Sequence, residues 1–444
     1  MLGKDKEGLR HSPAEVPPLK SNPEILSPAG DFEKLQVAIA YGADAVYIGG
    51  KQFSLRANTK NFDMIELESA IKYAHSHNVR VYVAVNIFAH NSDLDGLHEY
   101  LRNLKNIGAD AVIVADLGVF DVARQIPGLE IHISTQANVT NYQSAALYKS
   151  LGAKRVILAR ELSCAEIRKV NDRVSDETFQ TEVFAHGAMC VSYSGRCLLS
   201  SYMTGRDSNH GDCAQPCRWS YNLMEEQRPG EYLPVYETQR GTYIMNSKDL
   251  CLVEYIPELV ASGVSSLKIE GRMKSAYYVA VATSIYRQAL DDYYADPLLY
   301  ESKKAYYVNE LQKTSHRPMF TGFFADEKGH SQNPSQALIA GWAALRSAQP
   351  ASQGCAYETN TYSSTCEFLG IVTDYNKETG CAIIEQRNKF SVGDKVEFMK
   401  AGFTQTITDM YNAKGQPVDA APHAQEQICI KVSQPVVKFD IMRR

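Results

Sequence analysis

The sequence lacks any long hydrophobic run and any strong excess of charge of one sign. Nowhere in its 444 residues do eighteen apolar residues follow one another, and the N-terminal stretch MLGKDKEGLRHSPAEVPPLK contains no apolar segment of the kind found in secretion signals. We therefore expect a cytoplasmic protein that does not span a membrane. The net charge of -5 neither indicates nor excludes a nucleic-acid partner, because phosphate binding needs only a local basic face.

Signatures of several common enzyme classes are also absent. No G-x-S-x-G nucleophile motif occurs, and His98-Glu99 is followed by Arg102 where the helix of a zinc protease needs a second histidine. The first predicted strand is not followed by the G-x-G-x-x-G pattern of dinucleotide-binding sheets. The sequence therefore indicates neither a standard hydrolase nor a doubly wound dinucleotide-binding fold.

Cysteine, in contrast, is concentrated in one segment. Cys190, Cys197, Cys213 and Cys217 form a C-x6-C-x15-C-x3-C pattern, whereas the other six cysteines are scattered singly. Four thiolates complete the ligand shell of a tetrahedral zinc or of an iron-sulfur cube. The wide first gap favours the cluster, because structural zinc usually takes two closely spaced pairs. Zinc, two disulfides and buried free thiols are the alternatives, and a reducing cytoplasm disfavours disulfides.

A repeated unit organises the first part of the chain. A short apolar run, a polar turn and an amphipathic stretch of helix length lead into the next run, and the phrase GADAVYI (42–48) is nearly repeated as GADAVIV (108–114). A glycine ends each predicted helix, and each following strand is apolar throughout. This alternation over about 250 residues predicts an α/β fold, an eight-stranded β/α barrel of the TIM type. Four of the predicted strands lie within the related phrases 42–48, 108–114, 152–158 and 263–269, and the other four cover residues 24–26, 79–85, 130–134 and 182–186.

The length of the chain predicts more than one domain. We expect an N-terminal extension over 1–22, the barrel domain over 23–330 with a cysteine-rich insertion at 190–262, a linker over 331–364, and a small all-β barrel over 365–444. The linker is rich in Ser, Gln, Thr and Ala, and short apolar runs separated by turn signals follow it. The strands predicted in the last domain cover residues 367–373, 382–385, 395–398, 404–408, 427–432 and 436–440.

Two helices are predicted near the end of the barrel domain, over residues 275–292 and 299–311. They are rich in tyrosine. Such aromatic residues usually pack in a core and only occasionally stack on nucleic-acid bases, so we expect packing.

Polar residues follow the predicted barrel strands. In β/α barrels the chemistry lies at the C-terminal ends of the strands, although ordinary loop residues are found there too. The cysteine-rich segment begins directly after the seventh strand and is therefore expected over the same mouth. The strand-end residues of interest are Asn86, Gln136, Arg160, His186, Glu270 and Arg272.

Several long motifs resemble the collagenase-like peptidase family, historically classed as of unknown catalytic type. The resemblance extends over nearly the whole chain. Its departures are the N-terminal extension and the Ser/Gln/Thr-rich segment near 347–364. The motifs are EVFAHGAMCVSYSGRCLLS, CAQPCRW, RPGEY, GTYIMNSKDL and SLKIEGRMKS, with NKFSVGD near the C-terminus.

The resemblance is strongest to a branch of this family that modifies tRNA. It implies hydroxylation of the wobble uridine to 5-hydroxyuridine with prephenate as co-substrate, and a 4Fe-4S cluster held by Cys190, Cys197, Cys213 and Cys217. Prephenate carries two carboxylates, which guanidinium groups bind in a bidentate manner, so Arg160, Arg196 and Arg272 are the expected ligands. The remaining predicted site residues are Lys268 as a further cation, Asn86 and Gln136 as substrate-binding groups, and His186 and Glu270 for proton transfer.

Two other functions stay open on the sequence alone. A collagenase-like peptidase could use Cys190 with His186 as nucleophile and base, but a thiolate bound to iron is not available for attack on a carbonyl. A non-catalytic RNA-binding protein would tolerate loss of the strand-end residues. Variants of Arg160 or Arg272 that bind RNA but make no product would separate this third class from an enzyme.

Overall fold

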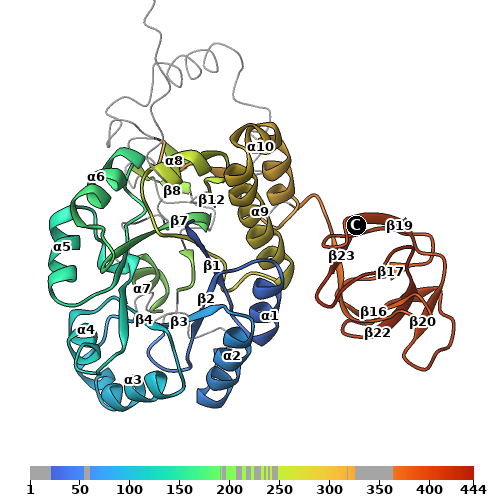
Figure 1. The fold of residues 1–444 in the computed structure, drawn as a ribbon, viewed down its shortest axis with the longest axis horizontal. Helices are drawn as coiled ribbons and strands as arrows, with labels where there is room; N and C mark the ends of the chain where they lie inside the picture. The colour runs from blue at the N-terminus through green and yellow to red at the C-terminus, as the bar shows by residue number, and fades with distance from the viewer. Residues whose placement is uncertain are drawn as a thin grey trace, which may run out of the picture.

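The computed structural model describes residues 22–54, 61–190, 192, 197–206, 213–216, 222–224, 232–234, 237–238, 241–242, 249–317, 319–325 and 364–444. These residues form a closed β/α barrel and a separate C-terminal β domain (Figure 1). The predicted N-terminal extension, apart from residue 22, and the predicted linker, apart from residue 364, lie outside the described residues.

The barrel consists of eight parallel strands, as the sequence predicted. β1 pairs with both β2 and β13, and β13 also pairs with β7, which closes the sheet. The strands are β1 (Glu24–Pro28), β2 (Ala45–Gly49), β3 (Arg80–Val85), β4 (Ala111–Val114), β5 (Glu130–Ile133), β6 (Arg155–Ile157), β7 (Gln180–Ala188) and β13 (Ser266–Ile269).

The repeated Gly-Ala-Asp phrase has a physical cause. Gly42 and Gly108 end their helices with φ of 94° and 93°, a left-handed conformation that glycine adopts without strain. The aspartate that follows ties the turn to the adjacent strand: Asp44 Oδ2 accepts from the Ile25 N–H at 2.8 Å, and Asp110 Oδ2 from the Val81 N–H at 2.7 Å. Each repeat therefore supplies both the stop of a helix and the registration of the next strand.

Helices surround the barrel (Figure 1). The tyrosines of the last two mostly pack in the core, as predicted: Tyr277, Tyr278, Tyr286, Tyr300 and Tyr307 are all buried. The helices are α1 (Phe32–Ala40), α2 (Met64–Ser76), α3 (Leu97–Asn106), α4 (Leu117–Ala123), α5 (Tyr142–Ser150), α6 (Cys164–Val174), α8 (Ile256–Ala261), α9 (Ala276–Ala295) and α10 (Pro297–Gln312), with single 3₁₀ turns η1 (Asn91–Asp93), η2 (Thr135–Ala137) and η5 (Val253–Tyr255). No helix within these described segments is long and apolar enough to cross a membrane.

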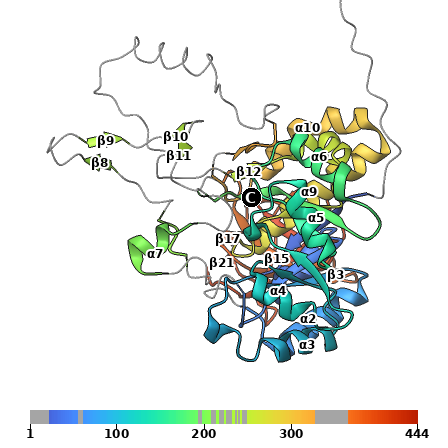
Figure 2. The same ribbon diagram turned by 90° about the vertical axis from the view of Figure 1, so that its left-hand side faces the viewer.

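The segment after β7 departs from a simple barrel repeat. β7 is followed by the short helix α7 (Leu199–Thr204), and β12 (Asp249–Cys251) then pairs antiparallel with the end of β7. β14 (Met319–Phe320) adds to the outer side of β12. Figure 2 shows α7 and the strands β8 (Asn222–Met224), β9 (Tyr232–Pro234), β10 (Glu237–Thr238) and β11 (Gly241–Thr242) standing apart from the barrel.

The C-terminal domain is an antiparallel all-β half-barrel with its own apolar core. One strand prediction was wrong: residues 436–440 precede the last strand, which is β23 (Ile441–Arg443). Asp440 in this segment accepts from the backbone N–H groups of Lys400 and Ala401, which holds it in a loop contact. The other strands are β15 (Phe368–Asn376), β16 (Cys381–Gln386), β17 (Phe390–Ser391), β18 (Lys395–Phe398), β19 (Phe403–Thr406), β20 (Met410–Asn412), β21 (Ala420–Ala421) and β22 (Gln427–Lys431).

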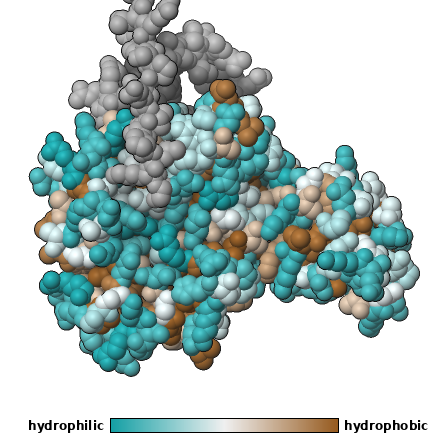
Figure 3. All heavy atoms as spheres, in the orientation of Figure 1, coloured by the Kyte–Doolittle hydropathy of each residue, from teal (hydrophilic) through white to brown (hydrophobic). Residues whose placement is uncertain are grey.

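The C-terminal domain packs beside α9 and α10. Arg443 is buried there and donates to Glu310 Oε2 of α10 at 2.7 Å and to the Tyr277 hydroxyl of α9 at 3.4 Å. The Tyr277 ring stacks on Phe368 with ring centroids 5.6 Å apart. The face in Figure 3 is mostly hydrophilic, with apolar residues in small patches, since most apolar side chains lie in the two cores.

Candidate functional site

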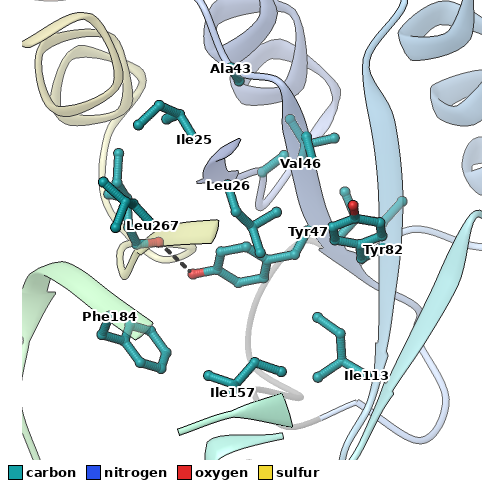
Figure 4. Close-up of a cluster of buried hydrophobic side chains, with 14 of the residues drawn as sticks. Ile25, Leu26, Ala43, Val46, Tyr47, Tyr82, Ile113, Ile157, Phe184 and Leu267 are labelled. Atoms are coloured by element: carbon teal, nitrogen blue, oxygen red, sulfur yellow. Dashed lines mark hydrogen bonds between the residues drawn. The ribbon is translucent and has the colours of Figure 1, made fainter. Parts of the chain in front are cut away.

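The floor of the barrel mouth is formed by Tyr47 and Glu270. Figure 4 shows the Tyr47 ring pointing across the barrel interior towards β13, with Phe184 and Ile157 nearby. Its hydroxyl donates to the Ile269 carbonyl at 3.1 Å and lies 3.3 Å from Glu270 Oε2. Glu270 is buried. A carboxylate held in this way, at the end of a barrel strand, is placed to exchange a proton with a bound molecule.

A network of buried charges lies below this floor. Lys268 Nζ donates to Glu182 Oε1 at 3.0 Å, and Arg155 Nη1 donates to Glu182 Oε2 at 3.2 Å and to Glu24 Oε1 at 2.6 Å. Burial opposes ionisation of Glu182, but the charges of Lys268 and Arg155 outweigh it and lower the pKa of this carboxyl. Lys268, predicted to bind substrate, therefore already has a carboxylate partner.

Arg272 fills a slot between the ends of β1 and β2. Its Nη1 donates to Ser54 Oγ at 3.0 Å, and the side chain is buried. A Cβ at Gly49 would lie 2.2 Å from that Nη1, and a Cβ at Gly30 would lie 2.1 Å from the Arg272 carbonyl oxygen. Glycine at both positions is thus required for the arginine to reach this place.

Arg160 lies on the opposite side of the mouth, beside the cysteine segment. Its Nη1 donates to the Ala188 carbonyl at 2.9 Å, and its guanidinium carbon lies 3.9 Å from the ring centroid of Phe184. The Arg160 charge also acts on the Cys190 thiol. A half-buried guanidinium stacked on a ring and held at one nitrogen is well suited to bind an anion.

Asn86 and Gln136, predicted to bind substrate, are brought together at the ends of β3 and β5. Gln136 Oε1 accepts from Asn86 Nδ2 at 2.7 Å and from Ser134 Oγ at 2.5 Å. Because the oxygen is engaged twice, the orientation of the amide is fixed. The two amides form one polar edge of the mouth.

Cys190 and Cys197 are close enough for a hydrogen bond between their thiols. This bond raises the pKa of Cys190 and lowers the pKa of Cys197 to about 5. The backbone N–H groups of Leu199 and Ser200, at the start of α7, also lower the pKa of Cys197. Within the pair, Cys197 is therefore favoured over Cys190 as the thiolate.

The donors around the sulfurs fit a metal-bound role. Every described cysteine of the predicted ligand set accepts a backbone N–H from two residues further on, and such bonds stabilise thiolates and tune iron-sulfur clusters. The donors are Ser192 for Cys190, Leu199 for Cys197 and Gln215 for Cys213.

The ligand set is incomplete within the described residues, because Cys217 lies outside them, as does Arg196. Cys213 reaches α7 through the next residue, where the Ala214 N–H donates to Ser200 Oγ at 2.9 Å. Across the ranges that the structure describes, no three His, Cys, Asp or Glu side chains converge as an ion site.

His186 lies away from the mouth. It is buried on the outer side of the sheet against α9, with ring centroids 5.8 Å from Tyr278 and 5.5 Å from Tyr286. Burial lowers the pKa of His186 to about 4. Its position favours a structural role, so Glu270 is the better placed of the two residues predicted to transfer protons.

Two residues of the mouth, Tyr47 and Ser54, were not predicted as site residues from the sequence. Tyr47 could have been found from strand periodicity, because it stands at an inward position of the apolar strand AVYIG and carries a hydroxyl. Ser54 lies in a loop with no recognisable pattern, and only the reach of Arg272 connects it to the site.

Comparison with known families decides the membership of this chain. Residues 30–334 match the family described as "Peptidase family U32", and residues 364–443 match "Peptidase family U32 C-terminal domain". The chain belongs to peptidase family U32. This confirms the resemblance drawn from the cysteine-rich motifs.

Curated U32 relatives include RNA-modifying proteins. The chain is 37% identical to tRNA hydroxylation protein P1 of Bacillus subtilis over 430 residues, 96% of each chain. It is 35% identical to tRNA hydroxylation protein P of Escherichia coli over 93% of this chain and 94% of the relative. A 23S rRNA 5-hydroxycytidine C2501 synthase of Escherichia coli is 36% identical over 69% of this chain and 46% of that protein.

Proposed function

We propose that this U32 protein is an RNA hydroxylase that converts the wobble uridine of tRNA to 5-hydroxyuridine, with prephenate as co-substrate. The observation that carries the proposal is the similarity, over 96% of both chains, to a protein named for tRNA hydroxylation. A wobble base is unpaired, so an enzyme can take it into a pocket at a lower cost than a paired base.

The mouth offers groups for each part of this reaction. Arg160 and Arg272 supply guanidinium groups for a dicarboxylate such as prephenate, and Arg196 is a third candidate by sequence. Asn86 and Gln136 present amides to a base, and Glu270 is the candidate proton-transfer group. We assign these roles from the position of each side chain at the mouth and from its chemistry.

We further propose that Cys190, Cys197, Cys213 and Cys217 hold a 4Fe-4S cluster. Bound there, such a cluster supplies one-electron redox chemistry. The support is the pattern of the four cysteines, the contact between Cys190 and Cys197, and the N–H donor at each described sulfur.

The arrangement of His186 weakens the peptidase alternative. Cys190 contacts Cys197 and is influenced by Arg160, whereas His186 packs under α9. A nucleophile and its base must lie within hydrogen-bond reach of each other, and these two side chains face different parts of the molecule.

The decisive experiment is nucleoside mass spectrometry of tRNA from cells that lack this protein and any oxygen-dependent enzyme that makes the same nucleoside. Wild-type protein should restore 5-hydroxyuridine, whereas Cys197→Ser and Arg272→Ala should not. Cys381→Ser, which changes a cysteine of the C-terminal domain, is the matched control and should restore it. Unchanged 5-hydroxyuridine in cells without the protein would refute the assignment.

Iron and sulfide content provide a second measurement on the same variants. Anaerobically purified wild-type protein should be brown, with iron and sulfide in near-equal amounts, and Cys197→Ser should be colourless. A colourless wild-type protein with stoichiometric zinc would exclude the cluster. Cleavage of collagen-like peptides by metal-free protein would support the alternative that the protein is a peptidase.

A further inference from the structure

The hydroxyl of Tyr47 has one proton and two acceptors within reach. It lies 3.1 Å from the Ile269 carbonyl oxygen and 3.3 Å from Glu270 Oε2. Both distances are longer than the ~2.7–2.8 Å that is usual for a hydroxyl donor, as expected when one proton is shared between two acceptors. A phenol can also accept a hydrogen bond through its oxygen, so it can pair with a carboxyl group that carries a proton.

These contacts give Glu270 a partner in both of its protonation states. When the carboxyl group is ionised, Tyr47 donates to Oε2, and a hydrogen bond to a charged acceptor is the stronger kind. When the carboxyl group carries a proton, it can donate to the Tyr47 oxygen, and the Tyr47 proton then turns to the Ile269 carbonyl. Glu270 can therefore gain or lose a proton without losing its hydrogen-bond partner.

A buried cation holds the Tyr47 ring in place. Lys268 Nζ lies 4.6 Å from the centroid of the Tyr47 ring, and Glu182 Oε1 accepts from the same ammonium group at 3.0 Å. An ammonium group over the face of an aromatic ring is attracted to it, most strongly where water is excluded, and Tyr47 is buried. In Figure 4 the ring points across the barrel towards β13, which carries Ile269. The hydroxyl is thus held beside Glu270.

The main chain of Glu270 is fixed on two sides. Its N–H donates to the His186 carbonyl of β7 at 2.8 Å, and its carbonyl accepts from the Tyr278 hydroxyl of α9 at 2.8 Å. Tyr278 thus binds the backbone, whereas Tyr47 contacts the carboxyl group itself. The charged and titratable side chains packed around this part of the barrel come from β2, β7, α9 and the segment of Glu270 itself: Tyr47, Glu182, Tyr278, Lys268 and Arg272.

We propose that Tyr47 is the positioning residue that holds the Glu270 carboxyl group, with or without its proton, while this group takes a proton from the bound substrate. The inference rests on the proposed function and adds a residue that acts through Glu270. Because a hydrogen bond to a carboxylate is stronger than one to the neutral acid, the hydroxyl also favours the ionised form, which accepts protons. Removal of the hydroxyl should therefore slow proton transfer and leave substrate binding unchanged.

Tyr47→Phe tests this role, because it removes the hydroxyl and keeps the ring over Lys268. Purified holoprotein, prephenate and a tRNA anticodon stem-loop are combined over a range of pH, and 5-hydroxyuridine is quantified by nucleoside mass spectrometry. The variant should lose about 10–100-fold in kcat, with the KM for RNA and for prephenate within about twofold of wild type. The acidic limb of the kcat profile should move to higher pH by about one unit, because the ionised carboxyl group loses a charged hydrogen bond.

Tyr82→Phe is the matched control. Tyr82 is also buried in the barrel, and its hydroxyl donates to Glu24 Oε2 at 2.9 Å, but Glu24 begins β1 at the opposite end of the sheet from the mouth. This variant loses the same kind of hydrogen bond and should keep the kcat, the KM and the pH profile of wild type. In a Glu270→Gln background, Tyr47→Phe should lower kcat no further, since the group through which it acts is already gone.

The proposal fails if Tyr47→Phe keeps the kcat and pH profile of wild type, if it mainly raises a KM, or if its effect adds to that of Glu270→Gln. A Tyr47→Phe protein that does not fold would assign the hydroxyl to the stability of the barrel and would also overturn the proposal. These outcomes leave the proposed function intact as long as the wild-type protein forms 5-hydroxyuridine. Absence of product from the wild-type holoprotein would overturn the proposed function as well.

Discussion

Single residues in the barrel show how similar charges serve different purposes. Lys268 and Arg160 are both cations near strand ends and were both predicted to bind substrate. Lys268 is buried against Glu182, whereas Arg160 is half-buried at the mouth. A buried cation with a carboxylate partner is committed to that partner, because its removal would leave a buried charge uncompensated, whereas a cation that faces the mouth can bind a ligand. Burial and existing partners thus separate two residues that the sequence treats alike.

Replacement of Lys268 should affect stability, and replacement of Arg160 should affect ligand binding. Lys268→Met leaves Glu182 buried with fewer compensating charges and should lower the free energy of unfolding in urea by about 3–5 kcal/mol. Arg160→Met should leave unfolding within about 1 kcal/mol of wild type and, if the proposed co-substrate is prephenate, raise its KM roughly 10–100-fold, because a charged hydrogen bond is lost. A normal KM in Arg160→Met would exclude this arginine from the anion site.

The orientation of His186 was not accessible from the sequence. Strict alternation along β7 would place Glu182, Phe184 and His186 on the same, inward face. The pairing of β7 with β13 shifts at this point, since Lys268 lies opposite Phe184 and Ile269 opposite His186. The irregularity turns His186 to the outer face. Such a bulge depends on the partner strand, so it cannot be predicted from a local sequence pattern.

At the scale of elements, the end of β7 is the most elaborate part of the barrel. Besides β6 and β13, it pairs with β12, and the Tyr286 hydroxyl of α9 donates to the Ala185 carbonyl at 2.7 Å. This packing encloses His186 and keeps it neutral. The sequence predicted the strand and the insertion that follows it, but not the return of residues 249–251 as a neighbouring strand, because pairing partners far apart in sequence leave no periodic signal.

The enclosed histidine should make the barrel sensitive to acid. Its pKa is about 4 in the folded protein and about 6.5 when unfolded, so between these values the unfolded chain binds the additional proton. The contribution of His186 to the free energy of unfolding is fully present above pH 6.5. It falls as the pH decreases, and about 3 kcal/mol is lost at pH 4. Urea unfolding of wild type and His186→Gln between pH 7.5 and 4.5 should show a shallower decline in the variant.

His98→Gln is the control for this titration, because His98 lies exposed on α3. It should leave the decline with pH as in wild type. Parallel curves for wild type and His186→Gln would show that His186 does not titrate differently in the folded and unfolded states.

At the scale of the whole molecule, the sequence predicted both domains but not how they meet. Glycine-aspartate repeats identify the barrel, and turn signals identify the β domain, since both are local features. The contact between the domains instead depends on a few side chains far apart in sequence. Arg387 bridges to Glu33, and the Ile441 N–H donates to the Tyr41 hydroxyl at 3.1 Å. Neither pair belongs to a pattern.

Arg443 should be the residue that holds the two domains together. It is buried and binds Glu310 of the barrel domain and Glu397 of the β domain at once, so Arg443→Ala leaves these carboxylates without their common cation. We expect a loss of about 3–5 kcal/mol in unfolding free energy and release of the C-terminal domain in limited proteolysis and small-angle scattering. The adjacent Arg444→Ala is the control, because Arg444 makes exposed ion pairs with Glu367 and Asp394 that contribute under about 1 kcal/mol. Equal behaviour of the two variants would show that the docking depends instead on the apolar contact between Tyr277 and Phe368.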